Sequence, residues 1–241
     1  DIELAKHFAT AINKLLKSQL LSAKDIIAIG NHGQTIRHRP TFKSPFTLQI
    51  GCSQTLACLT GIDVIGHFRH KDIALGGQGA PLVPAFHNVL VNNDHADTFF
   101  VNIGGIANIT YIPADKNKNV IGFDTGPGNA LLDAWYSQHQ LGCYDRKGDW
   151  AASGRISERL LTQLLAEPYF QQAPPKSTGR EQFHLAWLNN HLLDLSLSAA
   201  DVQATLVELT ATTIANEINR LSDNRSINKT NIYLCGGGVK N

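Results

Sequence analysis

Glycine-rich turns that follow short apolar runs recur along the whole chain, and they constrain the fold more than any other feature. The turns lie at residues 31–34, 76–79, 104–105, 124–128 and 236–238 of the 241-residue sequence. Short apolar runs are typical of strands buried within a sheet, and in α/β folds ligands bind where such strands end. The recurrence predicts two α/β halves whose glycine turns face a common cleft.

The composition argues against several classes of partner. Hydrophobic residues make up 43% of the chain and charged residues 17%, as in soluble globular proteins, and the net charge is only +1. A chain with this charge has no basic field to bind nucleic acid or an anionic membrane. No apolar run approaches the roughly 20 residues that span a bilayer. We therefore expect a cytoplasmic protein without nucleic-acid or membrane partners. Its four cysteines lack zinc-ligand spacing and are expected to be buried free thiols.

Local patterns in the first part of the chain predict helices and short strands. Apolar residues at helical spacing indicate an amphipathic helix over residues 2–20. Further elements are predicted at residues 26–29 (a strand covered on both faces), 47–50 (an edge strand), 52–59 (a helix), 61–66 (a strand) and 84–90 (a helix). The polar stretch 92–97 then predicts a boundary between one part at residues 1–96 and another at residues 97–241.

The pattern of strands and helices restarts after this boundary. Residues 98–103 and 106–111 are expected to form the two strands of a hairpin joined by a glycine turn. Further elements are expected at residues 120–123 (a strand), 130–135 (a helix), 156–165 (a helix), 202–221 (a long helix capped by Asp201) and 231–235 (a strand). The second part is therefore also expected to be an α/β unit.

A candidate acid lies in the stretch Gly66 to His87, which is expected to be a loop and reads GHFRHKDIALGGQGAPLVPAFH. Asp72 stands there between basic residues, Arg69 among them, and a Gly-Gly-Gln-Gly run that contains Gln78. Glycines let a backbone approach a ligand closely, and Asp72 follows a predicted strand end. A plain turn with a solvated ion pair would explain the same residues. The other glycine turns favour the functional interpretation.

His32 and Gln34 follow another predicted strand, in the run Gly30 to Thr35. Imidazole and amide groups suit hydrogen bonds to the hydroxyl groups of a polyol, and the nearby Arg37 and Arg39 could pair with a carboxylate. A polar β-turn without a ligand is the alternative.

A strand, a glycine turn and a helix start follow one another at Asp124-Thr125-Gly126-Pro127-Gly128-Asn129. Free backbone N–H groups and the positive end of a helix dipole make such a turn an anion site, and phosphate is the expected guest. The turn is neither a Walker A loop nor a dinucleotide fingerprint, since it lacks GK[ST] and GxGxxG. Asp124 is expected to hold Mg²⁺ through water, unless it only caps the helix.

Two further stretches suit a nucleotide. The polar loop PPKSTGRE carries Lys176, Ser177, Thr178 and Arg180, which together resemble an anion contact, although surface loops often have this composition. The run Gly236 to Gly238 follows a predicted strand and would let a flat group such as adenine lie on the backbone.

Seven stretches taken together resemble a known family. They read IAIGNHGQTIRHRP, FRHKDIALGGQGAPLVPAFH, VNIGGIANIT, GFDTGPGNALLDAW, PPKSTGRE, DVQATLVELTA and LCGGG, and they span nearly the whole chain. The chain is similar to the anhydro-N-acetylmuramic acid kinases, which belong to the superfamily of actin-like ATPases, sugar kinases and heat-shock chaperone ATPases. The resemblance implies an α/β fold of the two-lobed, actin-like (ribonuclease H-like) kind, with mixed sheets flanked by helices.

The resemblance also implies roles for individual residues. Asp72 would be the general base, and His32, Gln34, Arg69 and Gln78 would bind the sugar. The second phosphate loop and the adenosine site would comprise Asn102, Gly104, Gly105, Asn108, Asp124, Thr125, Gly126, Gly128, Asn129, Lys176, Gly236, Gly237 and Gly238. The implied cofactors are ATP and Mg²⁺, and the implied assembly is a homodimer.

Kinases of this family open the 1,6-anhydro ring of anhydro-N-acetylmuramic acid with water and phosphorylate O6, in peptidoglycan recycling and amino sugar catabolism. If Asp72 takes a proton from the water that attacks C1, the departing O6 can attack the γ-phosphate. A second carboxylate is then not needed as the acid. The alternatives are another sugar or acetate-type kinase of the superfamily and a non-catalytic ATP-binding module.

Two parts of the family pattern are missing from the sequence. The first phosphate loop, a Gly-Thr-Ser-x-Asp-Gly hairpin, does not occur, nor does the acidic helix expected beyond the CGGG turn. The chain is therefore expected to be a fragment that lacks both ends, and such a fragment is expected to show near-zero kinase activity.

Overall fold

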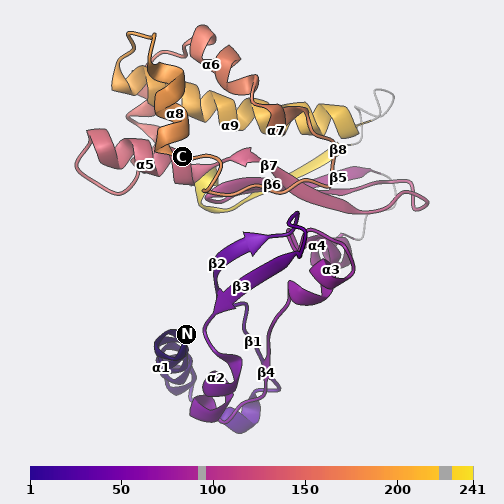
Figure 1. Ribbon diagram of the computed structural model, residues 1–241. Helices are drawn as coiled ribbons and strands as arrows, with labels where there is room; N and C mark the ends of the chain where they lie inside the picture. The colour runs from indigo at the N-terminus through magenta and orange to yellow at the C-terminus, as the bar shows by residue number, and fades with distance from the viewer. Residues whose placement is uncertain (92–95, 223–229, 241) are drawn as a thin grey trace. The chain divides into compact units, whose positions relative to one another are not determined.

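The computed structural model describes residues 1–91, 96–222 and 230–240 of the chain. The chain divides into two compact units, Asp1–Leu82 and Val83–Asn241 (Figure 1). The division lies earlier than the predicted boundary after residue 96, because helix α4 (Pro84–Leu90) packs on the sheet of the second unit. Residues 92–95 of the predicted boundary lie outside the described residues.

The first unit joins two short sheets to two packed helices. Its elements are α1 (Ile2–Ser18), η1 (Ala23–Asp25), β1 (Ile29–Gly30), β2 (Gln34–Arg39), β3 (Phe46–Ile50), α2 (Ser53–Thr60), β4 (Val64–Ile65) and α3 (His70–Ala74). β1 pairs with β4 in parallel, and β2 pairs with β3 antiparallel. α1 packs against α2 and buries Ala5 and Ala9, so the predicted amphipathic helix is confirmed.

Two expectations for the first unit are wrong. The strand predicted at residues 26–29 reduces to Ile29–Gly30, and the side chain of Ile27 is 96% exposed instead of covered. The predicted loop around Asp72 contains the short helix α3. This helix ends because Gly76 takes a positive φ of 87°, the left-handed conformation that commonly terminates a helix.

The second unit is a mixed four-stranded sheet with helices. Its elements are α4, β5 (Asp97–Ile103), β6 (Ile106–Ile112), β7 (Ile121–Pro127), α5 (Asn129–His139), η2 (Arg146–Gly148), η3 (Ala151–Ser153), α6 (Glu158–Leu165), α7 (Pro168–Gln171), α8 (Leu185–Leu192), α9 (Ala199–Leu221), β8 (Thr230–Cys235) and η5 (Gly237–Lys240). The strand order is β7-β6-β5-β8, with β8 parallel to β5 and the other pairs antiparallel. The α/β class, the β5–β6 hairpin and the helix predicted at residues 84–90 are confirmed.

Apolar side chains at alternate positions of β5 and β6 form a core of the second unit. Phe99, Val101 and Ile109 are fully buried, and they pack with Ile214 of α9. Figure 1 shows α6, α8 and α9 together on one face of this sheet. In the described parts of the chain, no helix is both long and apolar enough to cross a membrane.

His87 attaches α4 to the other face of the sheet. Phe100 and Thr110 alternate with the core residues of their strands and so face away from α9. The His87 ring stacks on Phe100 with ring centroids 4.1 Å apart, and its Nδ1 lies 2.9 Å from Thr110 Oγ1. Burial lowers the pKa of His87 below the ordinary value of 6.5.

The predicted cap of the long helix is wrong. α9 begins at Ala199, and Ser198 Oγ accepts a hydrogen bond from Asp201 N–H at 3.1 Å. Asp201 Oδ1 accepts the N–H of Arg155 at 2.7 Å, so this carboxylate ties a preceding segment to the helix.

The cysteines are free, as predicted, but none of them is buried. Cys58, Cys143 and Cys235 are exposed, and Cys52 is half-buried at the start of α2. The expectation of buried thiols is therefore wrong.

The lowered pKa of His87 predicts a pH dependence of stability. Below about pH 6.5 the unfolded chain binds a proton that the buried imidazole resists, so the free energy of unfolding should fall as the solution is acidified. Urea unfolding of wild type and His87→Gln between about pH 7.5 and pH 5 measures this effect. Wild type should lose more stability than the variant on acidification, and equal losses would contradict the assignment.

Candidate functional site

A row of polar side chains crosses three strands of the second unit. Asn102 of β5 pairs with Asn108 of β6, and Asn108 pairs with Asp124 of β7. Paired residues of neighbouring strands point to the same face of a sheet. Asn102 alternates with the core residue Val101, so the row lies on the face away from α9. Three predicted nucleotide-site residues are thereby brought together.

The turn of the β5–β6 hairpin holds the start of α5. The N–H groups of Gly128 and Ala130 donate to Gly105 O, each at 3.1 Å, and Asn129 N–H donates to Gly104 O at 2.8 Å. The sequence predicted free N–H groups at this helix start. That expectation is wrong for these three groups, because hairpin carbonyls already accept from them.

Asp124 is held by segments outside its own strand. Its Oδ2 accepts the N–H of Thr178 at 3.0 Å, and its own N–H donates to Lys176 O at 3.1 Å. The hydroxyl of Tyr169 donates to Asp124 O at 2.7 Å. The side chain of Asp124 is therefore fixed at the end of the polar row. The residue is also largely buried, with 7% of its surface exposed.

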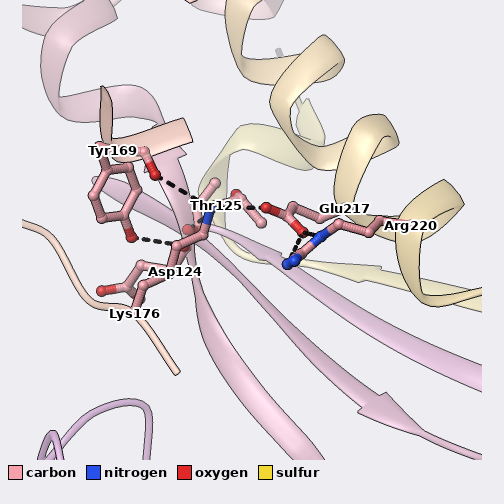
Figure 2. Close-up of polar contacts among 7 residues, drawn as sticks. Asp124, Thr125, Tyr169, Lys176, Glu217 and Arg220 are labelled. Carbon is pink, nitrogen blue, oxygen red and sulfur yellow. Dashed lines mark hydrogen bonds and ion pairs between the residues drawn. The ribbon is translucent and has the colours of Figure 1, made fainter. Parts of the chain in front are cut away.

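Beside Asp124 lies a buried ion pair, to which an exposed arginine adds a further contact (Figure 2). Lys176 Nζ donates to Glu217 Oε1 of α9 at 2.7 Å and to Tyr169 O at 3.4 Å. Arg220 Nε donates to Glu217 Oε2 at 2.7 Å. Burial, followed by the charges of Asp124 and Glu217, raises the pKa of Tyr169 far above its ordinary value, so the hydroxyl is a donor at neutral pH. Glu217 was not predicted as a site residue, because it lies outside all of the motifs.

The glycine turn after β8 lies close to Ile103, the last residue of β5. Gly236 takes φ 90°, and a Cβ there would come 2.5 Å from Ile103 O. A Cβ on Gly238 would come 2.3 Å from Ile103 Cγ2. Gly237 is different, because a Cβ there would have only Asn129 Nδ2 nearby, at 3.6 Å.

Gly237 also lines a cavity of about 580 Å³. The cavity is lined by Asn129, Asp133, Tyr144, Asp145, Arg146, Lys147, Gly237 and Lys240. Asn129 and Gly237 were predicted nucleotide residues, whereas the other lining residues were not predicted. The segment Tyr144 to Lys147 lies outside the motifs of the sequence. Burial raises the pKa of Asp133, and the charge of Arg180 opposes this shift.

In the first unit, Asp72 is bound to the glycine run that follows it. Its Oδ2 accepts the N–H of Gly79 at 2.6 Å, and its backbone O accepts the N–H of Gly77 at 2.8 Å. A Cβ on Gly77 would come 2.2 Å from Asp72 Oδ2. The carboxylate therefore shapes this turn, and its role as a base stays a prediction.

Arg69 connects the same turn to His32. Its Nη1 donates to Gly79 O at 2.8 Å, and its Nε donates to His32 Nε2 at 2.9 Å. His32 Nδ1 lies 2.7 Å from Gly33 O, a geometry that suits a neutral ring protonated at Nδ1. Two predicted sugar residues are thus in contact. Gln78 is half-buried within the turn.

Gln34 and Asn31 flank this arrangement in the sequence. Gln34 is exposed at the start of β2, where its Nε2 donates to Thr35 O at 3.2 Å. Asn31 was not among the predicted site residues. Its buried side chain donates to Gly51 O at 2.7 Å and accepts from Gly33 N–H at 3.1 Å, and so shapes the loop that carries His32.

The described residues include no cluster of three or more His, Cys, Asp or Glu side chains that could hold a metal ion. Asp124 and the amides of Asn102 and Asn108 present oxygen atoms, the ligand type that Mg²⁺ prefers. Such a sparse set suits an ion that also binds phosphate oxygens and water.

The mixed four-stranded sheet and the helices that flank it define an α/β protein, the class to which the actin-like ATPases belong. The family model for anhydro-N-acetylmuramic acid kinase matches residues 1–241. The chain therefore belongs to the anhydro-N-acetylmuramic acid kinase family.

Individual relatives agree with this assignment. An anhydro-N-acetylmuramic acid kinase of Colwellia psychrerythraea is 54% identical over 256 residues, which cover 100% of this chain and 63% of the relative. Relatives of the same name are 53% identical in Coxiella burnetii and 52% identical in Shewanella pealeana, each with 64% of the relative covered. The chain thus spans somewhat less than two thirds of the length of these relatives.

The contact between the hairpin turn and α5 predicts that a side chain at Gly128 destabilises the fold. A Cβ on Gly128 would come 2.5 Å from Gly104 O, a backbone atom that cannot move without disturbing the hairpin. Gly128→Ala should lower the free energy of unfolding by about 1–3 kcal/mol. Gly30→Ala is the control, since its Cβ would meet only Phe68 Cζ at 3.6 Å. Equal stability of the two variants in urea unfolding would contradict the prediction.

Proposed function

We propose that the full-length protein is an ATP-dependent kinase for 1,6-anhydro-N-acetylmuramic acid. It opens the 1,6-anhydro ring with water and phosphorylates O6 to give N-acetylmuramic acid 6-phosphate, in peptidoglycan recycling and amino sugar catabolism. The observation that carries this proposal is the family match over residues 1–241, together with relatives of that name at 52–54% identity.

The first unit supplies the groups for the sugar. His32, Arg69 and the Gly-Gly-Gln-Gly turn lie in contact, and they combine an imidazole, a guanidinium and backbone groups. Such groups suit the hydroxyl and carboxylate oxygens of a muramic acid. We also assign Gln34 and Gln78 to this function.

The second unit supplies the groups for ATP. The polar row across β5, β6 and β7 and the turn that starts at Asp124 face the phosphates, and adenosine lies along Gly236 to Gly238, beside the cavity lined by Gly237 and Asn129. Asp124 would hold Mg²⁺ through water, and the ion would neutralise charge on the transferred phosphoryl group. Arg146 and Lys147, which line the same cavity, are further candidates for nucleotide contacts.

Chemistry links the two reactions. Asp72 takes a proton from water as the water oxygen forms a bond to C1, and the bond between C1 and O6 breaks. The electron pair stays on O6, which attacks the γ-phosphorus, and ADP leaves. The developing alkoxide is consumed by phosphoryl transfer, so protonation of the leaving oxygen is not required.

ATP is a cytoplasmic substrate, so we place the reaction in the cytoplasm.

We also propose a homodimer. Sedimentation equilibrium of the full-length protein checks the dimer, and a single species of monomer mass would overturn it.

The assignment of Asp72 as the general base is tested by substituting Asp72 and Asp124 separately and comparing the two variants in one assay. Asp72→Asn should lower kcat at least about 100-fold, the usual contribution of general base catalysis, while sugar binding measured by calorimetry is retained. The assay follows ATP-dependent consumption of the anhydro sugar by the full-length protein, with ordinary hexoses as controls.

Asp124→Asn is the comparison variant in the same assay. If Asp124 serves through Mg²⁺, its variant should raise the Mg²⁺ concentration needed for half-maximal activity. Unchanged kcat in Asp72→Asn would remove the base assignment from Asp72. A fall of kcat in Asp124→Asn as large as that expected for Asp72→Asn, with an unchanged Mg²⁺ concentration for half-maximal activity, would transfer the general base assignment to Asp124.

The adenosine assignment is tested at Gly237. Its missing Cβ has room in the fold, so Gly237→Val should leave the protein folded but place a side chain against the cavity. We expect the Kd for ATP to rise about tenfold, equivalent to about 1.4 kcal/mol. Calorimetry on the full-length protein measures it, and Lys14→Ala on the exposed side of α1 is the control. An unchanged Kd would exclude adenosine from this cavity.

A further inference from the structure

A buried ion pair joins the PPKSTGRE loop to helix α9. Lys176 is 4% exposed and Glu217 is 6% exposed, and their charged groups are 2.7 Å apart. The ammonium group also lies over the ring of Tyr169, 5.0 Å from its centroid, and over the ring of Phe123, at 5.9 Å. Glu217 has a second partner in Arg220, on the next turn of the helix.

This ion pair is costly to break. Charges taken out of water are stabilised only by close partners, and removing one member of a buried pair leaves an uncompensated charge. The ammonium of Lys176 is held by Glu217 and by Tyr169 O, on two different elements. The pair therefore fixes the position of the loop backbone at Lys176 relative to α9.

The same backbone holds Asp124. Lys176 O accepts the N–H of Asp124, and Thr178 N–H donates to Asp124 Oδ2. Tyr169, whose carbonyl accepts from the ammonium, donates its hydroxyl to Asp124 O. Figure 2 shows Lys176 and Tyr169 reaching Asp124 from two neighbouring segments while Glu217 reaches Lys176 from α9.

We propose that Lys176 and Glu217 are positioning residues, which orient the Asp124 carboxylate by fixing the loop that hydrogen-bonds to it. Their effect on the reaction passes through the backbone at residues 176–178. This inference rests on the proposed kinase function, because it assigns the pair a role in that reaction. It differs from the prediction that Lys176 contacts the nucleotide, which would require the ammonium to leave Glu217.

The test uses matched variants of the full-length protein. Lys176→Met and Glu217→Gln each remove one charge, and the double variant removes both. The controls are Lys6→Met and Glu3→Gln, which make the same changes in an exposed ion pair of 3.2 Å on α1. The kcat and the KM for ATP and for the anhydro sugar are measured, with the folded fraction of each variant determined by circular dichroism at the assay temperature.

Positioning predicts a specific kinetic pattern. Each single variant should lower kcat per folded molecule about 10- to 100-fold, as small misplacements of a reacting group do. Both KM values should stay within about threefold, and the double variant should be no worse than the poorer single variant, because both substitutions break one unit. A rise in the KM for ATP with Lys176→Met alone would overturn the proposal in favour of a nucleotide contact. An unchanged kcat per folded molecule in both variants would reduce the pair to a structural role.

Hydrogen exchange gives a readout that does not need activity. The N–H groups of Asp124 and Thr178 are the donors that the pair is proposed to hold in place. Peptides that cover these two residues should exchange faster in Lys176→Met and Glu217→Gln, and unchanged in the Lys6→Met control. Unchanged exchange at both residues would overturn the positioning role. If the wild-type protein fails to phosphorylate the anhydro sugar, the proposed function fails, whereas the exchange experiment still decides whether the pair positions Asp124.

Discussion

Three backbone hydrogen bonds between the start of α5 and the Gly104–Gly105 turn hold the second unit of this protein in shape. They require the backbone of Gly128 to pass so close to Gly104 O that no side chain fits there. With the hairpin turn fixed, antiparallel pairing sets the register of β6 against both neighbours, and the row Asn102, Asn108 and Asp124 follows from that register. The helix start gives up the N–H groups that would otherwise be free for an anion. The candidate phosphate site is therefore defined by the polar row and by Asp124 more than by the helix terminus.

Much of this fold could be predicted because its signals are local. A proline at the first position of α4, the glycine turn of the β5–β6 hairpin and the apolar spacing of α1 are each contained within a few residues. The errors occurred where a longer-range contact decides. The apolar run around Ile27 forms little strand, because β1 pairs with β4 over only two residues. At α9 the cap predicted from the sequence was Asp201, but its carboxylate accepts the N–H of Arg155, which lies 46 residues away in the chain, and Ser198 caps the helix instead.

In the candidate site, too, the features that could be predicted are local ones, and those that could not depend on contacts distant in the sequence. Glycine motifs pointed to the hairpin turn, to the turn after β7 and to Gly236–Gly238, since glycine is needed where backbones meet. They could not show that the Asp72 carboxylate binds the N–H of Gly79, because the sequence does not show that α3 turns this side chain back towards the glycine run. Nor could they show the pairing of Lys176 with Glu217, which lie 41 residues apart. Charged residues in a polar loop are usually solvated, and only the packing of α9 reveals that this lysine is buried.

The proposed reaction requires that O6 of the anhydro sugar is both the leaving group of ring opening and the nucleophile of phosphoryl transfer. Turnover of the full-length protein in water enriched in oxygen-18, followed by mass spectrometry of the sugar phosphate, tests this claim directly. The proposed reaction predicts one labelled oxygen at C1 and none in the bond between O6 and phosphorus. Label in the phosphate ester, or phosphorylation that leaves the anhydro ring closed, would contradict it.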